Sequence, residues 1–392
     1  MAVPKNADKQ KKVQNAAAQK RAAQKKGIRK AAGSRKGGNK PAPLPTDPKK
    51  AKRELRRRRK MHKPHGELAI KLCAAFYGKP LGDMARKEQC AKVASLMPLV
   101  KGHVTDLALK HDSGRVVQAM FKFGSGPQRD ELLKEIKGHE ITLAKHSVGR
   151  RVFESMLRHC NNAAKQTLFE AFCGHWRELS SHRLASRPAD MVFRVCANAD
   201  QQRRVVQELA SAELAKFPMR NADGSFLSLQ QVVEKDPAKR SSLSTQVDAF
   251  LGKMLDKEVA ALSLVHRLLR DFVDAAEGDA RQRVVDAVCN TPLQILQTRE
   301  GAEALCRALP FASAKGRKQL IRGVKEHVHE IAEDQDASYF VMRLLQLVDD
   351  TVLLKKQVVT PLLNNMSELT ERPLTTAVLL NILKPRQQRY IG

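Results

Sequence analysis

The feature of this sequence that most constrains its fold is a short apolar pattern that returns every 36 to 40 residues. HDSGRVVQAM begins at His111, and the similar SVGRRVFESM begins at Ser147. With Val116 as the first anchor, equivalent apolar residues fall at Val152, Val192, Leu229, Leu268, Ala304, Phe340 and Val378. Pairs of short helices cannot bury their apolar faces alone, whereas stacked pairs can. The spacing therefore predicts an all-α solenoid of about seven or eight repeats.

The segments between the anchors have the spacing of short amphipathic helices. Apolar residues recur at intervals of three and four in RDELLKEI, RQRVVDAV and RKQLIRGV, which begin at Arg129, Arg281 and Arg317. Polar residues that can cap a helix stand before these and two further segments, and the predicted caps are Ser125, Asn162, Asp279, Ser313 and Asp350. Alternating, strand-like patterns are nearly absent. We therefore expect helices throughout residues 66–392.

Residues 1–65 differ in composition from the rest of the chain. They hold 23 Lys and Arg against three acids, which is +20 of the net +30 charge. Because they have almost no apolar periodicity, the sequence predicts a disordered basic arm ahead of the solenoid. The densest cluster is KAKRELRRRRKMHKPH, and its expected localisation or polyphosphate-binding residues are Lys52, Arg53, Arg56, Arg57, Arg58, Arg59 and Lys60. A solubilising tail is the alternative interpretation.

The overall charge and the cysteines limit the class of protein. A pI near 10.1 favours a polyanionic partner, with nucleic acid ahead of an anionic membrane surface. No apolar run approaches the ~18 residues of a membrane span, and the basic N-terminus does not resemble a secretory signal. The seven scattered cysteines are typical of reduced thiols in an intracellular protein. We expect no membrane among the partners.

Several segments resemble the repeats of pumilio-homology proteins. DSGRVVQAM and REGAEALCRAL are similar to the Y-G-x-x-V-x-Q helix of these repeats. Longer segments, such as LALKHDSGRVVQAMFKFGSGPQR and TREGAEALCRALPFASAKGRKQLI, follow the order of the Puf-A, or penguin-type, branch between Leu68 and Arg386. The resemblance implies a pumilio-like, armadillo-type solenoid. It also implies a nuclear and nucleolar protein that binds RNA or DNA through a basic surface with little sequence preference.

The same resemblance implies a place of action. Members of this branch take part in ribosome biogenesis, in rRNA processing and large ribosomal subunit assembly, and some regulate the translation of particular messages. The expected partners are therefore RNA, either pre-rRNA or mRNA, and the pre-60S ribosomal particle with its ribosomal proteins. Longer members continue beyond a segment similar to LNILKPR, so part of their repeat array is expected to be missing or replaced here.

The residues that read bases in sequence-specific pumilio repeats are largely replaced in this chain. In those repeats the side chains two before and two after the anchor contact base edges, and the side chain one before it stacks on a base. The edge positions here include Gly114, Ala302, Met342 and Leu380, which cannot form hydrogen bonds to a base edge. Tyr339 is the single aromatic residue at a stacking position. The sequence therefore predicts that the base code has been lost.

Positive charge recurs instead near the starts of the expected inner helices. Arginine donates to phosphate oxygens as a fork, and a helix N-terminus adds partial positive charge. The candidate nucleic-acid-binding residues are Lys110, His111, Arg115, Gln118, Lys145, His146, Arg150, Arg151, Arg194, Arg267, Arg270 and Tyr339. Backbone contacts give affinity without reading sequence, and a merely solvated face is the alternative. Glu303 indicates a weaker basic surface in the later repeats.

No pattern typical of catalysis or metal binding stands out. One cluster lacks the paired short spacing of a zinc module; it consists of His159, Cys160, Cys173 and His175. His62 and His65 are interpreted as surface or phosphate-contact residues. We expect no enzyme activity, no metal, no cofactor and no small-molecule substrate. Two alternative functions stay open, namely a sequence-specific mRNA-binding translational regulator and an armadillo- or HEAT-like protein-interaction scaffold.

Overall fold

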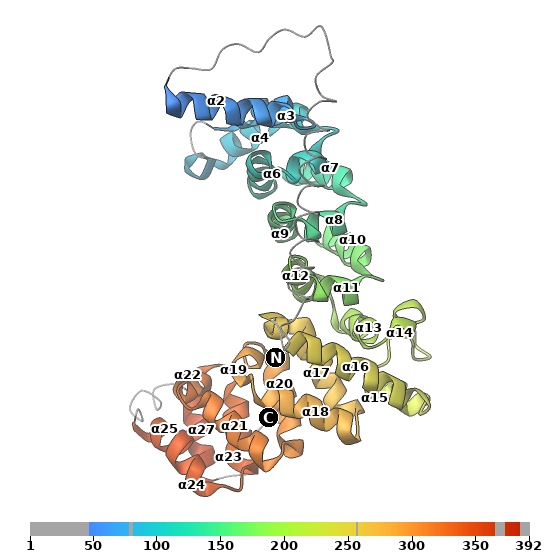
Figure 1. The fold of residues 1–392 in the computed structure, drawn as a ribbon, viewed down its shortest axis with the longest axis vertical. Helices are drawn as coiled ribbons and strands as arrows, with labels where there is room; N and C mark the ends of the chain where they lie inside the picture. The colour runs from blue at the N-terminus through green and yellow to red at the C-terminus, as the bar shows by residue number, and fades with distance from the viewer. Residues whose placement is uncertain (1–46, 78–80, 256–257, 365–372, 385–392) are drawn as a thin grey trace, which may run out of the picture. The chain divides into compact units, whose positions relative to one another are not determined.

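The computed structural model describes residues 47–77, 81–255, 258–364 and 373–384. These residues form helices joined by short turns (Figure 1). Their β-type pairing is limited to an isolated bridge between Arg220 and Phe226. The predicted all-α solenoid is therefore confirmed. No helix among the described residues is long and apolar enough to cross a membrane.

The first of two compact units, Met1–Lys63, contributes the described helix α2 (Pro48–Met61). This helix corrects the prediction that the whole arm is disordered. Lys, Arg, Ala and Leu favour helices, and the Asp47 carboxylate accepts a 2.8 Å hydrogen bond from the Lys49 amide at the helix start. Glu54 lies 3.2 Å from Arg58 one turn later, which adds further support. Residues 1–46 lie outside the described residues, so disorder stays a prediction there.

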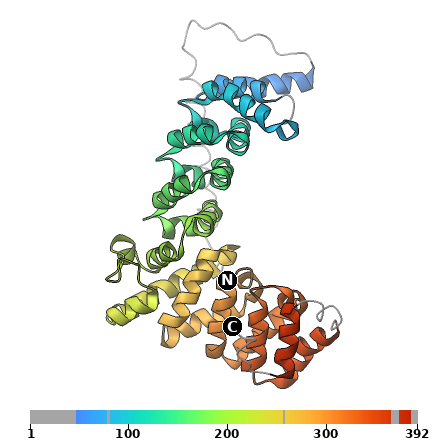
Figure 2. The same ribbon diagram turned by 180° about the vertical axis from the view of Figure 1, so that it is seen from behind.

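The second compact unit, Pro64–Gly392, consists of repeats of a short helix, an inner helix and an outer helix. Three regular repeats contain α5 (Val104–Ala108), α6 (His111–Phe123) and α7 (Gly126–Ile136), then α8 (Glu140–Lys145), α9 (Gly149–His159) and α10 (Asn162–Phe172), then α11 (Trp176–Ser181), α12 (Ser186–Cys196) and α13 (Ala199–Ala210). The inner helix α6 packs on α9, and α9 packs on α12 (Figure 2). This stacking buries the anchors Val116, Val152 and Val192 completely.

An additional repeat precedes those that the spacing predicts. It consists of α3 (Gly66–Phe76), the short turn η1 (Leu81–Asp83) and α4 (Arg86–Val100). α3 packs on α6 as a further inner helix, and its Leu72 is fully buried. Leu72 precedes Val116 by 44 residues. Because that interval exceeds the spacing of the other anchors, the sequence pattern did not reveal this repeat.

The later repeats follow the same plan with more irregular connections. They contain η2 (Glu258–Ala261), α17 (Ser263–Ala275), α18 (Gly278–Cys289), α19 (Pro292–Ile295), α20 (Arg299–Ala308), η3 (Leu309–Phe311), α21 (Ala314–Val324), α22 (Val328–Glu333), α23 (Ser338–Leu347), α24 (Thr351–Leu354), η4 (Lys355–Val359), α25 (Thr360–Asn364) and α27 (Pro373–Leu383). The inner helices α17, α20, α23 and α27 stack in this order. Their anchors Leu268, Ala304, Phe340 and Val378 are buried as predicted.

The region between α13 and α17 overturns one predicted anchor. It holds α14 (Ala212–Lys216), α15 (Leu229–Lys235) and α16 (Lys239–Leu255). α17 packs directly on α12, and the Leu264 amide donates a 3.1 Å hydrogen bond to Asp190 Oδ1 across this contact. Leu229 was therefore wrong as an inner-helix anchor. It is buried because the short helix that it begins packs on the side of α17.

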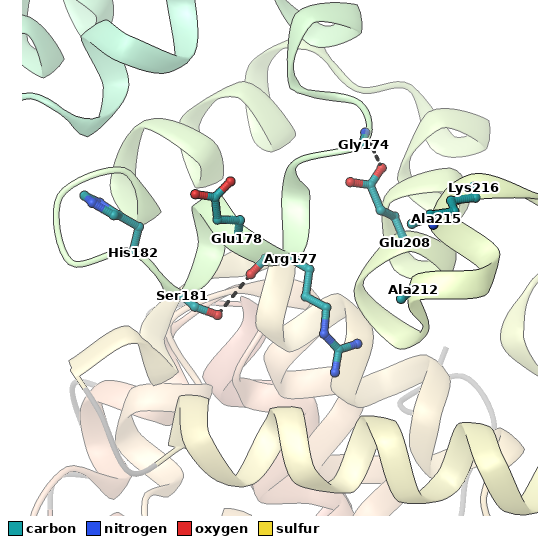
Figure 3. Close-up of a pocket in the computed structure, with 9 residues that line it drawn as sticks. All are labelled: Gly174, Arg177, Glu178, Ser181, His182, Glu208, Ala212, Ala215 and Lys216. Atoms are coloured by element: carbon teal, nitrogen blue, oxygen red, sulfur yellow. Dashed lines mark hydrogen bonds between the residues drawn. The ribbon is translucent and has the colours of Figure 1, made fainter.

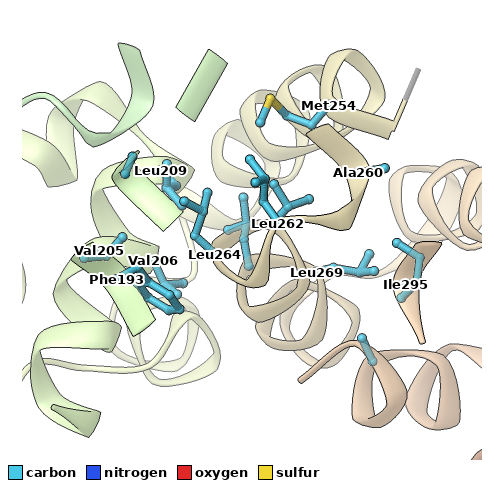
Figure 4. Close-up of a cluster of buried hydrophobic side chains, with 14 of the residues drawn as sticks. Phe193, Val205, Val206, Leu209, Met254, Ala260, Leu262, Leu264, Leu269 and Ile295 are labelled. Carbon is cyan, nitrogen blue, oxygen red and sulfur yellow. The ribbon is translucent and has the colours of Figure 1, made fainter. Parts of the chain in front are cut away.

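The hydrophobic core continues across the junction between α13 and α17 (Figure 4). The labelled side chains come from both sides of it and are Phe193, Val205, Val206, Leu209, Met254, Ala260, Leu262, Leu264, Leu269 and Ile295. All of them belong to one cluster that runs from Leu72 to Leu379. Each repeat thus buries its apolar surface against its neighbours, as a solenoid requires.

Most of the predicted helix starts are confirmed by their caps. Ser125, Ser313 and Asp350 stand at the caps of α7, α21 and α24. The cap of α10 is Asn161, one residue before the predicted Asn162. Asp279 lies inside the first turn of α18 and does not cap it. Cap chemistry thus predicted helix starts to within about two residues.

Candidate nucleic-acid interface

Three stacked inner helices each present a basic side chain at the same position of the repeat. Arg115 on α6 and Arg151 on α9 are exposed, one residue before their buried anchors. Lys71 on α3 is also exposed and stands one residue before Leu72. None of the three forms an ion pair within the described part of the chain. The repeat spacing did not reveal Lys71 or its helix, although the order Lys71-Leu72 matches the Arg-Val order of α6 and α9.

A second row of basic side chains lies two turns further along the same helices. Lys122 on α6 and Arg158 on α9 are exposed and follow the first row by seven residues, which returns them to the same side of the helix. On α12, Arg187 and Arg194 form a similar exposed pair. Together these residues make up the basic surface, which is Lys71, Arg115, Lys122, Arg151, Arg158, Arg187 and Arg194. An anion can reach all of them from solvent.

The net charge is unevenly distributed along the second unit. Residues 66–198 contain 21 Lys and Arg and 13 acids, a net charge of +8. Residues 199–392 contain 27 Lys and Arg and 25 acids, a net charge of +2. The basic surface lies wholly within the first of these parts. A local excess of positive charge attracts polyanions to that part of the solenoid.

Four predicted contacts are already engaged within the fold. One of them belongs to the basic surface, because Arg194 Nε lies 3.1 Å from Asp190 Oδ2. The Lys145 ammonium lies 2.6 Å from Glu178 Oε1, and the Lys110 ammonium binds a backbone carbonyl. The His111 ring lies 3.1 Å from the neighbouring aspartate carboxylate. Exposed pairs of this kind contribute little free energy, so a phosphate can compete for these cations. They are nevertheless weaker candidates than Lys71, Arg115 and Arg151, which form no ion pair among the described residues.

His146 has a structural role that the sequence did not indicate. Its Nδ1 accepts hydrogen bonds from the amides of Val148 and Gly149, at 3.3 and 3.2 Å, and so begins helix α9. His182 uses Nδ1 in the same way before α12. Asp334 uses Oδ1 in the same way before α23. The recurrence indicates that this position supplies an acceptor for unpaired amides at a helix start.

Arg267 and Arg270 do not point freely into solvent, because their side chains are 12% and 16% exposed. Both contact Asp271; Arg267 also donates to Gln202 and Arg270 to Glu303, each at 2.8 Å. Burial alone would raise the pKa of Glu303, but its hydrogen bonds with arginines lower it. Glu303 therefore stays charged and holds Arg270. Because their donors are occupied inside the solenoid, both arginines are weaker candidates for nucleic-acid contact than the basic surface.

Tyr339, Arg150 and Gln118 lie beside the anchors of their inner helices, as the repeat pattern predicts. Tyr339 is 44% exposed on α23, directly before Phe340. Arg150 and Gln118 are half-buried beside the anchors of α9 and α6. A Cβ at Gly114 would lie 2.9 Å from a backbone carbonyl oxygen, so this edge position serves close helix packing. That use of Gly114 agrees with a lost base code.

The predicted arm residues lie on one described helix. Lys52, Arg56, Arg57 and Arg59 are exposed on α2, and Arg58 is half-buried. Arg53 and Lys60 belong to the same helix. Glu54 is the single acid of this helix and lies 3.8 Å from Arg57. Helix α2 therefore carries positive charge along most of its length.

A hollow of about 660 Å³ lies beside α11, α13 and α14 (Figure 3). Its lining residues are Gly174, Arg177, Glu178, Ser181, His182, Glu208, Ala212, Ala215 and Lys216. The Arg177 guanidinium donates to the Leu209 carbonyl at 2.5 Å, and the Glu208 carboxylate accepts from the Gly174 amide at 2.9 Å. These charged groups therefore hold helices together. The lining contains no nucleophile paired with a base.

Burial makes several of the cysteines weakly reactive. All seven are free thiols. Burial raises the pKa of Cys173 to about 11 and that of Cys196 and Cys289 to about 12, so these groups stay protonated and weakly nucleophilic. Among the described residues, one group of three side chains has the spacing of metal ligands, and it contains no cysteine. The side chains of His159, Cys160, Cys173 and His175 do not have that spacing.

Comparison with known proteins supports the pumilio resemblance. Residues 138–236 match the family described as a NOP9-like PUF repeat domain, and residues 114–137 match a Pumilio-family RNA binding repeat. Pumilio homolog 3 of Danio rerio is 32% identical over 320 residues, which cover 80% of this chain and 50% of the relative. The Schizosaccharomyces pombe Pumilio homology domain family member 6 is 26% identical over 339 residues, covering 85% and 51%. The chain thus spans about half the length of the curated relatives it matches.

Two solved structures have a similar fold. Human Puf-A superposes with a TM-score of 0.75 and 22% sequence identity, over 83% of this chain and 62% of Puf-A. Human Puf-A in complex with DNA superposes with a TM-score of 0.74 and 22% identity, over 84% of this chain and 64% of that one. The predicted pumilio-like arrangement of repeats is therefore confirmed.

Proposed function

Since this chain is a solenoid of pumilio-type repeats with the fold of human Puf-A, we propose that it binds RNA through the phosphate backbone. The proposed contact is the basic surface. One observation carries the proposal. Exposed basic side chains with no ion-pair partner among the described residues recur at one position of three successive inner helices, at Lys71, Arg115 and Arg151. Nucleic acid carries a phosphate in each nucleotide, so a row of cations, one in each repeat, can contact several phosphates of one strand.

Low sequence preference is part of the proposal. Edge positions occupied by residues such as Gly114, Ala302 and Leu380 offer no hydrogen bonds to bases. Affinity must then come from phosphate contacts, which are indifferent to sequence and sensitive to salt. Tyr339, exposed at a stacking position, is the one feature that favours a sequence-specific mRNA regulator instead. A single stacking residue gives little discrimination between bases.

The proposed place of action is the nucleolus, where the chain would take part in ribosome biogenesis. Its RNA would be pre-rRNA, and its partners the pre-60S ribosomal particle and ribosomal proteins. The resemblance to penguin-type proteins supports this assignment. The basic arm supports it as well, because a cluster of Lys and Arg can serve both as an address and as an RNA contact.

The first test is RNA binding by the full chain over a salt series. The change is the double substitution Arg115→Ala and Arg151→Ala. The slope of log K against log salt should fall in magnitude by about 1.4, because each phosphate contact with a single strand contributes about 0.7. Fluorescence anisotropy with several unrelated single-stranded RNAs measures the slope and any sequence preference together.

A matched control removes the same charge from another surface. Lys315 and Arg322 are exposed on the outer helix α21, and replacing both with alanine should leave the slope unchanged. Equal effects of the two double variants would reject the proposed interface. A preference of about 10³ or more for one RNA would favour the translational regulator. Binding that depends on neither pair would favour a protein scaffold with an RNA-binding arm.

A further inference from the structure

Histidines recur at the starts of the short helices. His103, His139, His175 and His327 directly precede α5, α8, α11 and α22. Three of them have an acid three residues later, in the pairs His103–Asp106, His175–Glu178 and His327–Glu330. In the last two pairs the ring lies 3.9 Å and 2.9 Å from its own acid. Each such pair by itself offers two possible metal ligands, too few for a specific site.

The first pair gains a third group from another segment. His65 directly precedes α3, and its Nε2 lies 3.2 Å from Asp106 Oδ2. The His65 and His103 rings lie with their centroids 4.3 Å apart. One ligand atom from each of the three residues lies within 4.8 Å of the others, a spacing that no other group among the described residues has. His65 is exposed, as expected of a surface residue, and it also lies beside two further possible ligands.

The turn that carries His103 is held in place before any ligand arrives. The Glu135 carboxylate accepts hydrogen bonds from the amides of Gly102 and Val104, at 2.8 and 3.3 Å. These bonds fix the backbone on both sides of His103. Asp106 then follows on the first turn of α5, three residues later and on the same side. Two of the three side chains are therefore presented by one rigid turn.

The segment that carries His65 is fixed as well. His65 has φ 53° and ψ 29°, the left-handed conformation that non-glycine residues rarely adopt. It is the single such residue in the described part of the chain. The carbonyl of the preceding Pro64 accepts a hydrogen bond from the Lys110 ammonium. Backbone strain of this kind concentrates at functional sites, because the surrounding structure must maintain it.

We propose that His65, His103 and Asp106 bind one Zn²⁺ ion. Imidazole nitrogens and a carboxylate oxygen are ligands that zinc accepts. Bonds of about 2.0 to 2.1 Å place tetrahedral ligand atoms roughly 3.3 Å apart. His65 and Asp106 already have this spacing, and a ring nitrogen of the half-buried His103 lies within 4.8 Å of both ligand atoms. Water completes the fourth position, because two of the three residues face solvent.

The ion would join two segments that are far apart in the sequence. His65 stands at the start of the first inner helix, α3, whereas His103 and Asp106 begin the next repeat. Both metal-bound histidines must be neutral, so binding releases any proton that they carry. Zinc would therefore fix the beginning of the solenoid, close in sequence to Lys71 of the basic surface. This proposal does not depend on the proposed RNA binding.

The test is titration of the untagged full chain with Zn²⁺ in a calorimeter, and with Co²⁺ by visible absorption. The variants are His65→Asn and His103→Gln, each made alone. Asn tolerates the left-handed backbone at position 65, so the fold is kept while the imidazole is lost. The unsubstituted chain should bind one equivalent at this site, and each variant should lower its affinity by roughly tenfold or more. The Zn²⁺-induced rise in Tm should disappear with it.

Matched controls come from the same motif in other repeats. His175→Gln and His327→Gln remove histidines that pair with an acid in the same way but have no third ligand among the described residues. Both controls should bind Zn²⁺ as the unsubstituted chain does. If all four variants bind alike, or if the unsubstituted chain takes up no equivalent, the proposal is overturned. Circular dichroism of each variant without metal shows that any loss of binding is not a loss of fold.

Discussion

His266 shows how a side chain at a predicted base-reading position can become part of the core. It stands two residues before the anchor Leu268, yet it has no exposed surface. Its Nε2–H donates to the Ala260 carbonyl at 2.7 Å, so Nδ1 accepts from the Thr298 hydroxyl, also at 2.7 Å. Burial lowers the pKa of His266 to about 4. The ring is therefore neutral and joins the segment before α17 to the start of α20.

This histidine makes the stability of the solenoid depend on pH. Its pKa falls from about 6.5 when unfolded to about 4 when folded, so the unfolded chain binds the proton more tightly. The stabilisation is complete above pH 6.5 and is lost as the pH falls towards 4, by up to about 3 kcal/mol. Urea unfolding at pH 7 and pH 4.5 should show this loss, and His266→Gln should reduce the difference. An equal pH dependence in the variant would contradict the assignment. His327→Gln serves as the control, because His327 is only half-buried.

At the scale of single residues, the sequence predicted positions better than it predicted partners. Arg115 and Arg151 stand where the repeat register placed them, and both are exposed. Arg267 occupies the same register but is held by Asp271. Arg270 is held by Glu303, which is 33 residues away on the next inner helix. Contacts between repeats cannot be read from one sequence, because they depend on how neighbouring helices are rotated against each other.

Among the elements, the outer helices show a recurring arginine at their fourth position. Arg129 of α7 donates to the carbonyls of Lys122 and His159, at 3.2 and 2.8 Å. These carbonyls end the inner helix of its own repeat and that of the next one. Arg317 of α21 bridges the corresponding helix ends, to carbonyls of Pro310 and Leu347, both at 3.4 Å. One guanidinium thus satisfies unpaired carbonyls at two helix ends, where positive charge is favourable.

Arg129→Met tests whether this bridge couples neighbouring repeats. The substitution keeps much of the side-chain volume but leaves two helix-end carbonyls without their donor, and the bond to the His159 carbonyl is partly buried. The free energy of unfolding should fall by about 1 to 3 kcal/mol, and amide hydrogen exchange should accelerate at the ends of α6 and α9. Arg158→Met is the control, because Arg158 is exposed on the same repeats without such a bridge. Unchanged exchange in the Arg129 variant would show that packing alone couples the repeats.

Element by element, periodicity predicted which segments are helices but not how they stack. The anchors on α6, α9 and α12 are correct because 36 and 40 residues suffice for one regular repeat. Leu229 fits the same spacing, yet α17 packs on α12 and leaves α15 to the side. An apolar pattern predicts that a side chain is buried, but it does not predict which neighbouring helix buries that side chain. α3 was missed for the opposite reason, because the interval from Leu72 to Val116 exceeds the common spacing.

At the scale of the whole molecule, positive charge declines along the chain. The net charge is +20 over residues 1–65, +8 over residues 66–198 and +2 over residues 199–392. The last part contains nearly as many acids as bases, and several of its arginines are bound to those acids. A polyanion is therefore attracted to the arm and to the first repeats. The later repeats have the same fold without the same charge, which leaves their surface suited to other partners.

Removing residues 1–63 separates the two sources of positive charge. The second compact unit has its own core, which begins at Leu72, so the shortened chain should keep the same thermal transition. Its salt slope should be several units smaller in magnitude, because about twenty positive charges are lost. Binding should nevertheless remain measurable, should stay indifferent to sequence, and should weaken further with Arg115→Ala and Arg151→Ala.

Those results would place part of the RNA contact on the repeats themselves. If the shortened chain folds normally but binds no RNA, the arm supplies all of the affinity, and the solenoid is a protein scaffold that carries an RNA-binding tail.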